Sequence, residues 1–163
     1  MLFDVLTALQ NLGPVAALRA SRWVYPLVNA GHIAGLALLV GAILPLDLRL
    51  LGVWRSVPLA LLARVLVPTA MAGLALAAIS GLLLFSVSAG KYAATPLFWL
   101  KLGLIAAAVA NALLLRRSAE WTLALVPDLP QDGPGARLRA AGALSAVLWL
   151  AALVCGRLLA YLA

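Results

Sequence analysis

Four long apolar stretches, separated by polar segments, dominate the pattern of this chain. They cover about residues 25–46, 65–87, 96–115 and 138–162, and each is close to the roughly 20 residues that a helix needs to cross a bilayer. Apolar and polar positions do not alternate with a period of two, as they would along the strands of a membrane barrel. The pattern therefore predicts an all-α integral membrane four-helix bundle, with residues 1–163 forming a single membrane domain.

The segments between the stretches are rich in residues that end helices. Pro45 and Pro58 bracket the first connection, so Asp47 is expected in a loop, and the third connection (116–137) has too many Pro and Gly residues for regular structure. The segment 1–23 combines apolar residues such as Phe3 and Leu6 with polar ones such as Asp4. This segment is predicted to be an amphipathic helix in the membrane interface, retained in the mature protein.

Composition supports the membrane assignment and excludes other classes of protein. The chain is 66% hydrophobic and 10% charged, whereas soluble domains average about 45–50% apolar and about 25% charged residues. A short soluble domain cannot cover so many apolar side chains. The net charge of +7 comes from scattered Lys and Arg residues, which does not match a nucleic-acid-binding patch. The expected partner is the lipid bilayer, and no nucleic acid is expected.

The basic residues predict the orientation in the membrane. Seven of them lie at the first and third connections: Arg49, Arg55, Arg64, Arg116, Arg117, Arg137 and Arg139. The opposite side has three, namely Arg19, Arg22 and Lys91. The positive-inside rule then makes the loop 116–137 cytoplasmic and places both termini in the periplasm of a bacterial inner membrane.

Three ionisable residues fall within the predicted spans and are the candidate functional residues. His32, Lys101 and Arg157 all lie in the predicted outer half of the membrane, where no acidic residue is expected beside them. The two long side chains either reach the headgroups or face an anionic ligand. Asn29 and Ser80 are expected to join His32 in a polar cluster. His32 is then either a hydrogen-bonded structural histidine, an axial ligand of haem b, or a donor to a quinone carbonyl.

Several motifs, in order along nearly the whole chain, carry a resemblance to a known family: Trp23-Val24-Tyr25-Pro26, His32, Asp47-Leu48-Arg49-Leu50-Leu51-Gly52, Ser80-Gly81-Leu82-Leu83-Leu84-Phe85, Lys91-Tyr92, Phe98-x-x-Lys101, Asn111, Ser145 with Trp149, and Gly156-Arg157. With these residues the chain resembles an uncharacterised bacterial four-span inner-membrane family, a domain of unknown function. More distantly, it is similar to copper resistance D-like membrane proteins. The resemblance implies a haem held by one histidine in the first span and another near the end of the third. Here the second position is Arg116, so His32 would hold a haem alone or between two copies.

These observations leave three functions open. The chain has no catalytic motif, and small residues at Gly31, Gly35, Gly73, Ala77 and Gly81 predict close helix packing. We therefore expect a non-catalytic accessory or scaffold subunit that packs against other membrane protein subunits or forms a homo-oligomer. The second hypothesis is a haem- or quinone-binding electron-transfer protein that uses His32, Lys101 and Arg157. The third is transport of copper or a small solute, although soft sulfur ligands are few.

Overall fold

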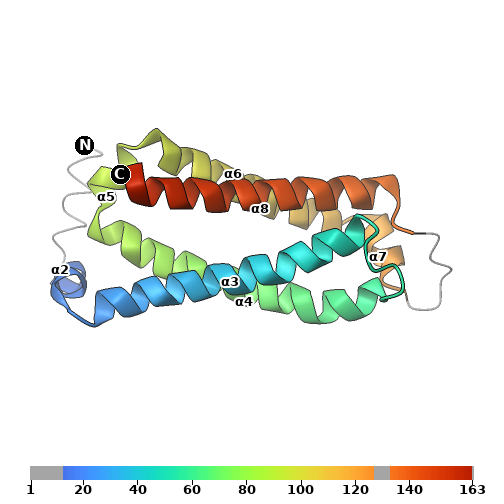
Figure 1. Cartoon of the computed structure of the whole chain (residues 1–163), viewed down its shortest axis with the longest axis horizontal. Coiled ribbons are helices and arrows are strands. Elements are labelled where there is room, and N and C mark those ends of the chain that lie inside the picture. Colours follow the sequence, from blue (N-terminus) through green and yellow to red (C-terminus); the bar gives the residue numbers. More distant parts are fainter. Residues whose placement is uncertain (1–12, 127–132, 163) are drawn as a thin grey trace.

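The computed structural model describes residues 13–126 and 133–162, and every regular element in these ranges is a helix (Figure 1). The helices are α2 (Gly13–Ala20), α3 (Val24–Leu50), α4 (Leu59–Val87), α5 (Ala89–Ala93), α6 (Pro96–Arg116), α7 (Ala119–Ala124) and α8 (Ala136–Leu162). Four of them, α3, α4, α6 and α8, are long and apolar enough to cross a membrane. The predicted all-α four-helix bundle is confirmed, and the chain is a multi-pass membrane protein. Residues 1–12 of the predicted interfacial helix lie outside the described residues.

The first connection is shorter than the sequence predicts. Helix α3 continues through Pro45 to Leu50, and α4 begins at Leu59. The prediction that Asp47 lies in a loop is therefore wrong: Asp47 is on a helix and is buried. A proline removes only one backbone hydrogen bond, and neighbouring groups in a membrane bundle can compensate for that loss. The helix end is held by Arg49, whose Nε donates to the carbonyl of Val57 at 2.8 Å.

The third connection also differs from the prediction, because it contains the short helix α7. Ser118 begins this helix, and its hydroxyl accepts a hydrogen bond from the backbone N–H of Trp121 at 3.2 Å, as a helix N-cap does. Trp121 is buried and packs with Leu50 and Leu59. Helix α7 therefore closes this end of the bundle, where the Pro and Gly content predicted irregular structure throughout.

Helices α3 and α4 form one closely packed pair. A Cβ atom added to Gly35 would lie 2.6 Å from the backbone nitrogen of Ala77, and one added to Gly73 would lie 2.5 Å from that of Leu39. The backbones can approach this closely only because both positions lack a side chain. The predicted role of small residues is confirmed here, but it does not extend to Gly31, which has nothing within 4 Å.

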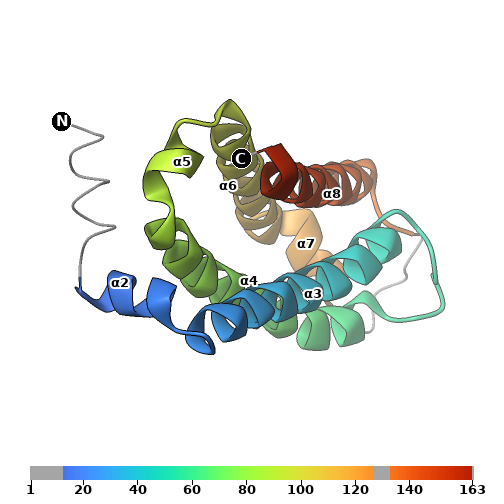
Figure 2. The same ribbon diagram turned by 60° about the vertical axis from the view of Figure 1, so that its left-hand side comes forward.

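Helices α6 and α8 form the second pair, joined by a hydrogen bond from Asn111 Nδ2 to the carbonyl of Ala141 at 3.0 Å. The two pairs meet near Gly142 of α8, where a Cβ atom would lie 2.8 Å from Cβ of Leu50 on α3. Away from this crossing α3 and α8 diverge toward the other end of the bundle, where α5 connects α4 to α6 (Figures 1 and 2). The bundle is therefore closed at the α7 end and more open at the α5 end.

Candidate functional site

His32 lies on α3 at the more open end of the bundle and is half-buried. Its Nδ1 atom is 2.9 Å from the carbonyl oxygen of Ala77 and 3.2 Å from Oγ of Ser80, both on α4. A carbonyl oxygen can only accept, so Nδ1 carries a proton and donates it to Ala77. The Ser80 hydroxyl donates in turn to the carbonyl of Leu76. The predicted proximity of His32 and Ser80 is thus present, and the carbonyl of Ala77 determines the tautomer of the imidazole.

This tautomer leaves Nε2 of His32 with a free lone pair, because no hydrogen bond to Nε2 occurs within the described residues. Gly81 makes room for the ring, since a Cβ atom at this position would lie 3.0 Å from Cε1 of His32. Gly81 was predicted to serve helix packing, but it accommodates the imidazole instead. A histidine held in this way by a backbone carbonyl has one nitrogen ready to accept a hydrogen bond or to bind a metal.

Lys101 of α6 points into the bundle and does not extend to the headgroups. A Cβ atom on Gly156 of α8 would lie 3.3 Å from its Nζ atom, so the ammonium group lies between α6 and α8. No ion pair with Lys101 is found in the described part of the chain. The ammonium group is therefore a free donor inside the bundle.

The other two predicted site residues do not join this group. Arg157 is exposed: one of its nitrogens donates to the Tyr161 hydroxyl at 2.7 Å, and its guanidinium lies 4.7 Å from the centre of the Tyr161 ring. Asn29 is exposed and has no side-chain hydrogen bond among the described residues. The structure brings His32 and Ser80 together. With Lys101, which lies toward the same α5 end of the bundle, they form what we call the His32 cluster.

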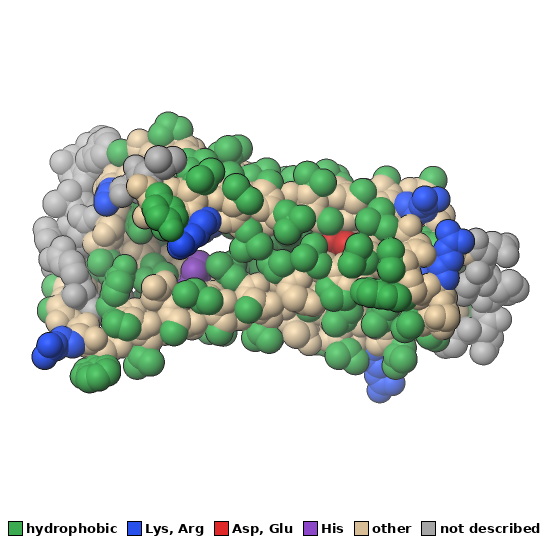
Figure 3. All heavy atoms as spheres, in the orientation of Figure 1, with side chains coloured by type: hydrophobic (Ala, Val, Ile, Leu, Met, Phe, Trp, Pro, Cys, Tyr) green, Lys and Arg blue, Asp and Glu red, His purple; other side chains and the backbone are tan. Residues whose placement is uncertain are grey.

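The His32 cluster is accessible from the side of the bundle. Figure 3 shows the face between α3 and α8 hollowed beside His32, the purple side chain, with a basic side chain at the edge of the hollow. In a membrane this face is directed toward the lipid, because α3 and α8 are both spanning helices. A ligand dissolved in the bilayer can therefore reach His32 sideways.

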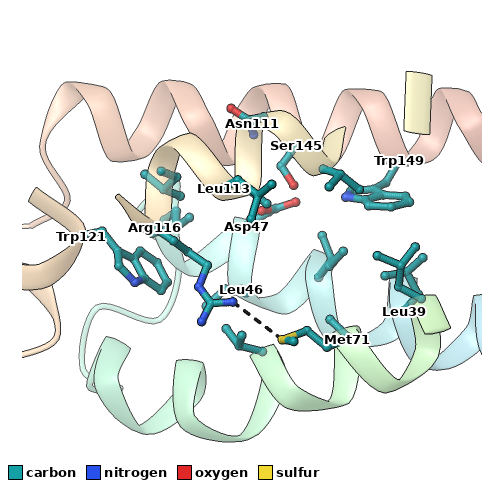
Figure 4. Close-up of a pocket in the computed structure, with 18 residues that line it drawn as sticks. Leu39, Leu46, Asp47, Met71, Asn111, Leu113, Arg116, Trp121, Ser145 and Trp149 are labelled. Carbon is teal, nitrogen blue, oxygen red and sulfur yellow. Dashed lines mark hydrogen bonds between the residues drawn. The ribbon is translucent and has the colours of Figure 1, made fainter. Parts of the chain in front are cut away.

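A second polar site, which the sequence did not reveal, lies toward the closed end of the bundle (Figure 4). Asp47 is only 4% exposed and lines a cavity of about 260 Å³ between the four spanning helices, with Trp121 of α7 also in its wall. The hydroxyl of Ser145 on α8 lies beside the Asp47 carboxylate (Figure 4). Oδ2 of Asp47 and Nε1 of Trp149 have no hydrogen-bond partner among the described residues.

Sequence reasoning missed this site because Pro45 suggested the end of the first span. The available signal was the spacing of Ser145 and Trp149, which places both side chains on one face of α8. Arg116 of α6 also lines the cavity, and one of its nitrogens contacts the sulfur of Met71 at 3.7 Å. The cavity therefore combines a carboxylate, an indole N–H and a guanidinium with mainly apolar walls.

The arrangement of the spans bears directly on a haem held by two histidines. Lys101 lies toward the same α5 end of the bundle as His32, and Arg116 is fifteen residues farther along α6, which corresponds to about 22 Å of helix. A histidine at position 116 would thus lie too far from His32 to bind the same iron. A comparison with protein-family models, curated proteins and solved structures finds no match to this chain.

Proposed function

We propose that this chain binds a lipophilic hydroxyl compound of the quinol class at the opening beside His32, and that it is not itself an enzyme. The observation that carries the proposal is the free Nε2 lone pair of His32, fixed by the hydrogen bond from Nδ1 to Ala77. A quinol hydroxyl can donate a hydrogen bond to this nitrogen. The quinol would bring the redox chemistry, and the chain would hold and orient it.

The chemistry of the His32 cluster distinguishes the reduced ligand from the oxidised one. With its proton on Nδ1, the neutral ring of His32 has no N–H to offer a quinone carbonyl. Lys101 supplies the complementary donor, because its ammonium group can bond to an oxygen lone pair of the same molecule. Hydrogen bonds to charged groups contribute about 1.5–3 kcal/mol each, so loss of Lys101 would weaken binding about tenfold or more.

The same nitrogen is also suited to a different cofactor, haem b, with His32 as its single protein ligand. Metal-bound histidines generally donate their other ring N–H to a carbonyl or carboxylate, as His32 does to Ala77. Lys101 would then meet a haem propionate. A visible spectrum of the purified protein separates the two ligands, because only haem gives a Soret band.

Binding of decylubiquinol to the detergent-purified protein tests the proposal. We expect saturable binding that falls about tenfold or more in His32→Leu and in Lys101→Met. Matched controls are Asn29→Leu and Arg157→Gln, which lie outside the cluster and should bind as the wild type does. The dimethyl ether of the quinol should bind weakly because it cannot donate. Equal binding by all four variants would refute the proposal.

A role as an accessory subunit has support from a different surface. Ala108 is the only buried residue of α6, whereas Gly103, Ala106 and Ala107 are exposed. Gly103 and Ala107 are four residues apart, the spacing at which small residues allow another membrane helix to approach. We propose this face as the contact with another subunit or a second copy. Native mass spectrometry of mild-detergent preparations should show a larger complex. Ala107→Leu should disrupt this complex, whereas the control Ala37→Leu, at an exposed position of α3, should leave it intact.

We also propose that both ends of the described chain face the periplasm of a bacterial inner membrane. The seven basic residues of the first and third connections gather at the α7 end, and α2 and the end of α8 lie at the other (Figure 1). With Cys155 replaced by Ser, a cysteine at exposed Ser56 should react only in inside-out vesicles, and one at Ser21 only in intact spheroplasts. The opposite labelling would reverse the orientation.

A further inference from the structure

The cavity that Asp47 lines contains two polar atoms that are buried and unsatisfied. Oδ2 of Asp47 is an acceptor without a donor, and Nε1 of Trp149 is a donor without an acceptor in the described residues. Buried polar groups are nearly always hydrogen-bonded, and each one left unpaired costs free energy. Two such atoms of opposite character in one cavity therefore indicate a ligand that supplies both partners.

The protein itself does not satisfy the carboxylate. No Lys or Arg in the described part of the chain forms an ion pair with Asp47. Arg49, two residues away, is buried but donates to the backbone carbonyls of Val57 and Arg55. Arg116 lies at the rim of the cavity and contacts the thioether of Met71, a weak acceptor. Oδ2 thus remains available to a donor inside the cavity.

Trp149 defines the second contact. Its ring packs against Leu39 and Ala108 in a buried cluster, so the indole is held in place while its N–H stays unpaired. Ser145, which lies beside Asp47 (Figure 4), is four residues before Trp149 on α8. Ser145 and Trp149 therefore lie on one face of α8, and both line the cavity.

The size and walls of the cavity suit a substituted ring better than water alone. Its volume is about 260 Å³, and an apolar cavity of roughly 150 Å³ already binds benzene. Most of the lining is aliphatic, including Ile43, Val67 and Leu74. Ligand sites of this kind combine an apolar wall with a few polar groups that orient the ligand.

We infer that this cavity binds an uncharged lipophilic molecule with a hydroxyl donor at one end and a carbonyl oxygen at the other. The hydroxyl donates to Oδ2 of Asp47, and the carbonyl accepts from Nε1 of Trp149. A cationic amine would satisfy Asp47 but would leave the indole N–H unpaired. The site is separate from the His32 cluster, since Asp47 is fifteen residues beyond His32 on α3, or about 22 Å of helix.

Tritiated butyl 4-hydroxybenzoate is a suitable probe, because its phenol and its ester carbonyl lie at opposite ends of one ring. Binding is measured by scintillation proximity with the whole chain in phosphatidylcholine nanodiscs. We expect saturable binding, weakened about tenfold in Asp47→Asn and about fivefold to tenfold in Trp149→Phe. Trp99→Phe, an exposed tryptophan, and His32→Leu should bind like the wild type. The His32→Leu control distinguishes this cavity from the quinol site proposed above, and Trp99→Phe controls for the loss of a tryptophan.

Competition on the wild-type protein provides a test that does not depend on whether a variant folds. Unlabelled butyl 4-hydroxybenzoate should displace the probe at a concentration at least tenfold lower than butyl 4-methoxybenzoate, which has a similar shape and no hydrogen-bond donor. Equal displacement by both compounds would overturn the inference. Absence of saturable binding would also overturn it and would indicate a cavity that holds only water. Binding lost in His32→Leu and kept in Asp47→Asn would assign the probe to the His32 cluster instead.

Discussion

Replacement of Gly35 by alanine should separate α3 from α4 and destabilise the bundle. The new Cβ atom would lie 2.6 Å from the backbone nitrogen of Ala77 and 3.0 Å from the carbonyl oxygen of Gly73. Ordinary contacts between non-bonded heavy atoms are about 3.5–4.0 Å, so the two backbones must move apart by about 1 Å. The atoms in the way belong to a helix backbone, which cannot rotate aside as a side chain can.

The expected loss in the free energy of unfolding is about 1–3 kcal/mol, the usual cost of overpacking a tight interface. The higher helix propensity of alanine, about 0.8–1 kcal/mol in water, should contribute little, because a membrane helix stays helical when the bundle comes apart. Gly31 and Gly41 on the same helix provide controls, since a Cβ atom at either position has nothing within 4 Å. Alanine at these positions should change stability by less than about 0.5 kcal/mol.

Unfolding can be followed by tryptophan fluorescence as SDS is added to dodecylmaltoside micelles. Trp149 packs with Leu39 of α3, so its emission reports the separation of the two helix pairs. Gly73→Ala should destabilise as well, and the double variant with Gly35→Ala should lose less than the sum, because both substitutions push apart the same helices. If Gly35→Ala is as stable as Gly31→Ala, the close approach of α3 and α4 is refuted.

Three further predictions concern the connections and the second helix pair. Arg49→Met should lower the free energy of unfolding by about 2–3 kcal/mol, because it leaves backbone carbonyls unpaired. It should also speed tryptic cleavage within residues 51–58, and an unchanged cleavage rate would contradict the role of Arg49. Asn111→Leu should cost about 1 kcal/mol in the same SDS titration by removing the hydrogen bond between α6 and α8. Glu120 is the only glutamate of the chain, and its pKa is lowered by its own backbone N–H and then by Arg137. The ionised side chain therefore contributes a little stability at pH values above the ordinary pKa of glutamate. This contribution is lost as the pH falls through the lowered pKa of the folded state. Carbon-13-labelled glutamate should titrate below the ordinary pKa of a glutamate side chain and shift upward in Arg137→Gln; an unchanged midpoint in Arg137→Gln would contradict the ion pair.

The amino-acid sequence by itself determined the class of fold and the number of spanning helices. Apolar runs of bilayer length leave a chain few alternatives, because every backbone group in lipid must be paired within a helix or a closed barrel. For this reason the predicted spans 96–115 and 138–162 agree closely with α6 and α8. The close approach of α3 and α4 was also foreseeable, since Gly35, Gly73 and Ala77 are small residues at helical spacing.

Only the tertiary structure decided which polar side chains work together. Lys101 and Arg157 look alike in sequence, yet one points at Gly156 inside the bundle and the other turns outward to Tyr161. The proton on Nδ1 of His32 follows from the carbonyl of Ala77 on another helix. Such contacts depend on how each helix is rotated and tilted against its neighbours, and hydrophobicity along the chain carries little information about rotation when a helix is apolar all around.

Asp47 illustrates the same limit most clearly. Its neighbour Pro45 is a sound signal for the end of a helix in water, and only the packing of α3 against α8 shows that the helix continues and buries the carboxylate beside Ser145. The unpaired atoms of Asp47 and Trp149 come from different helices, and no local pattern links them. The sequence alone thus determined that the chain crosses a membrane, and the tertiary structure decided where a ligand can be held, because a binding site is made of contacts between residues far apart in the chain.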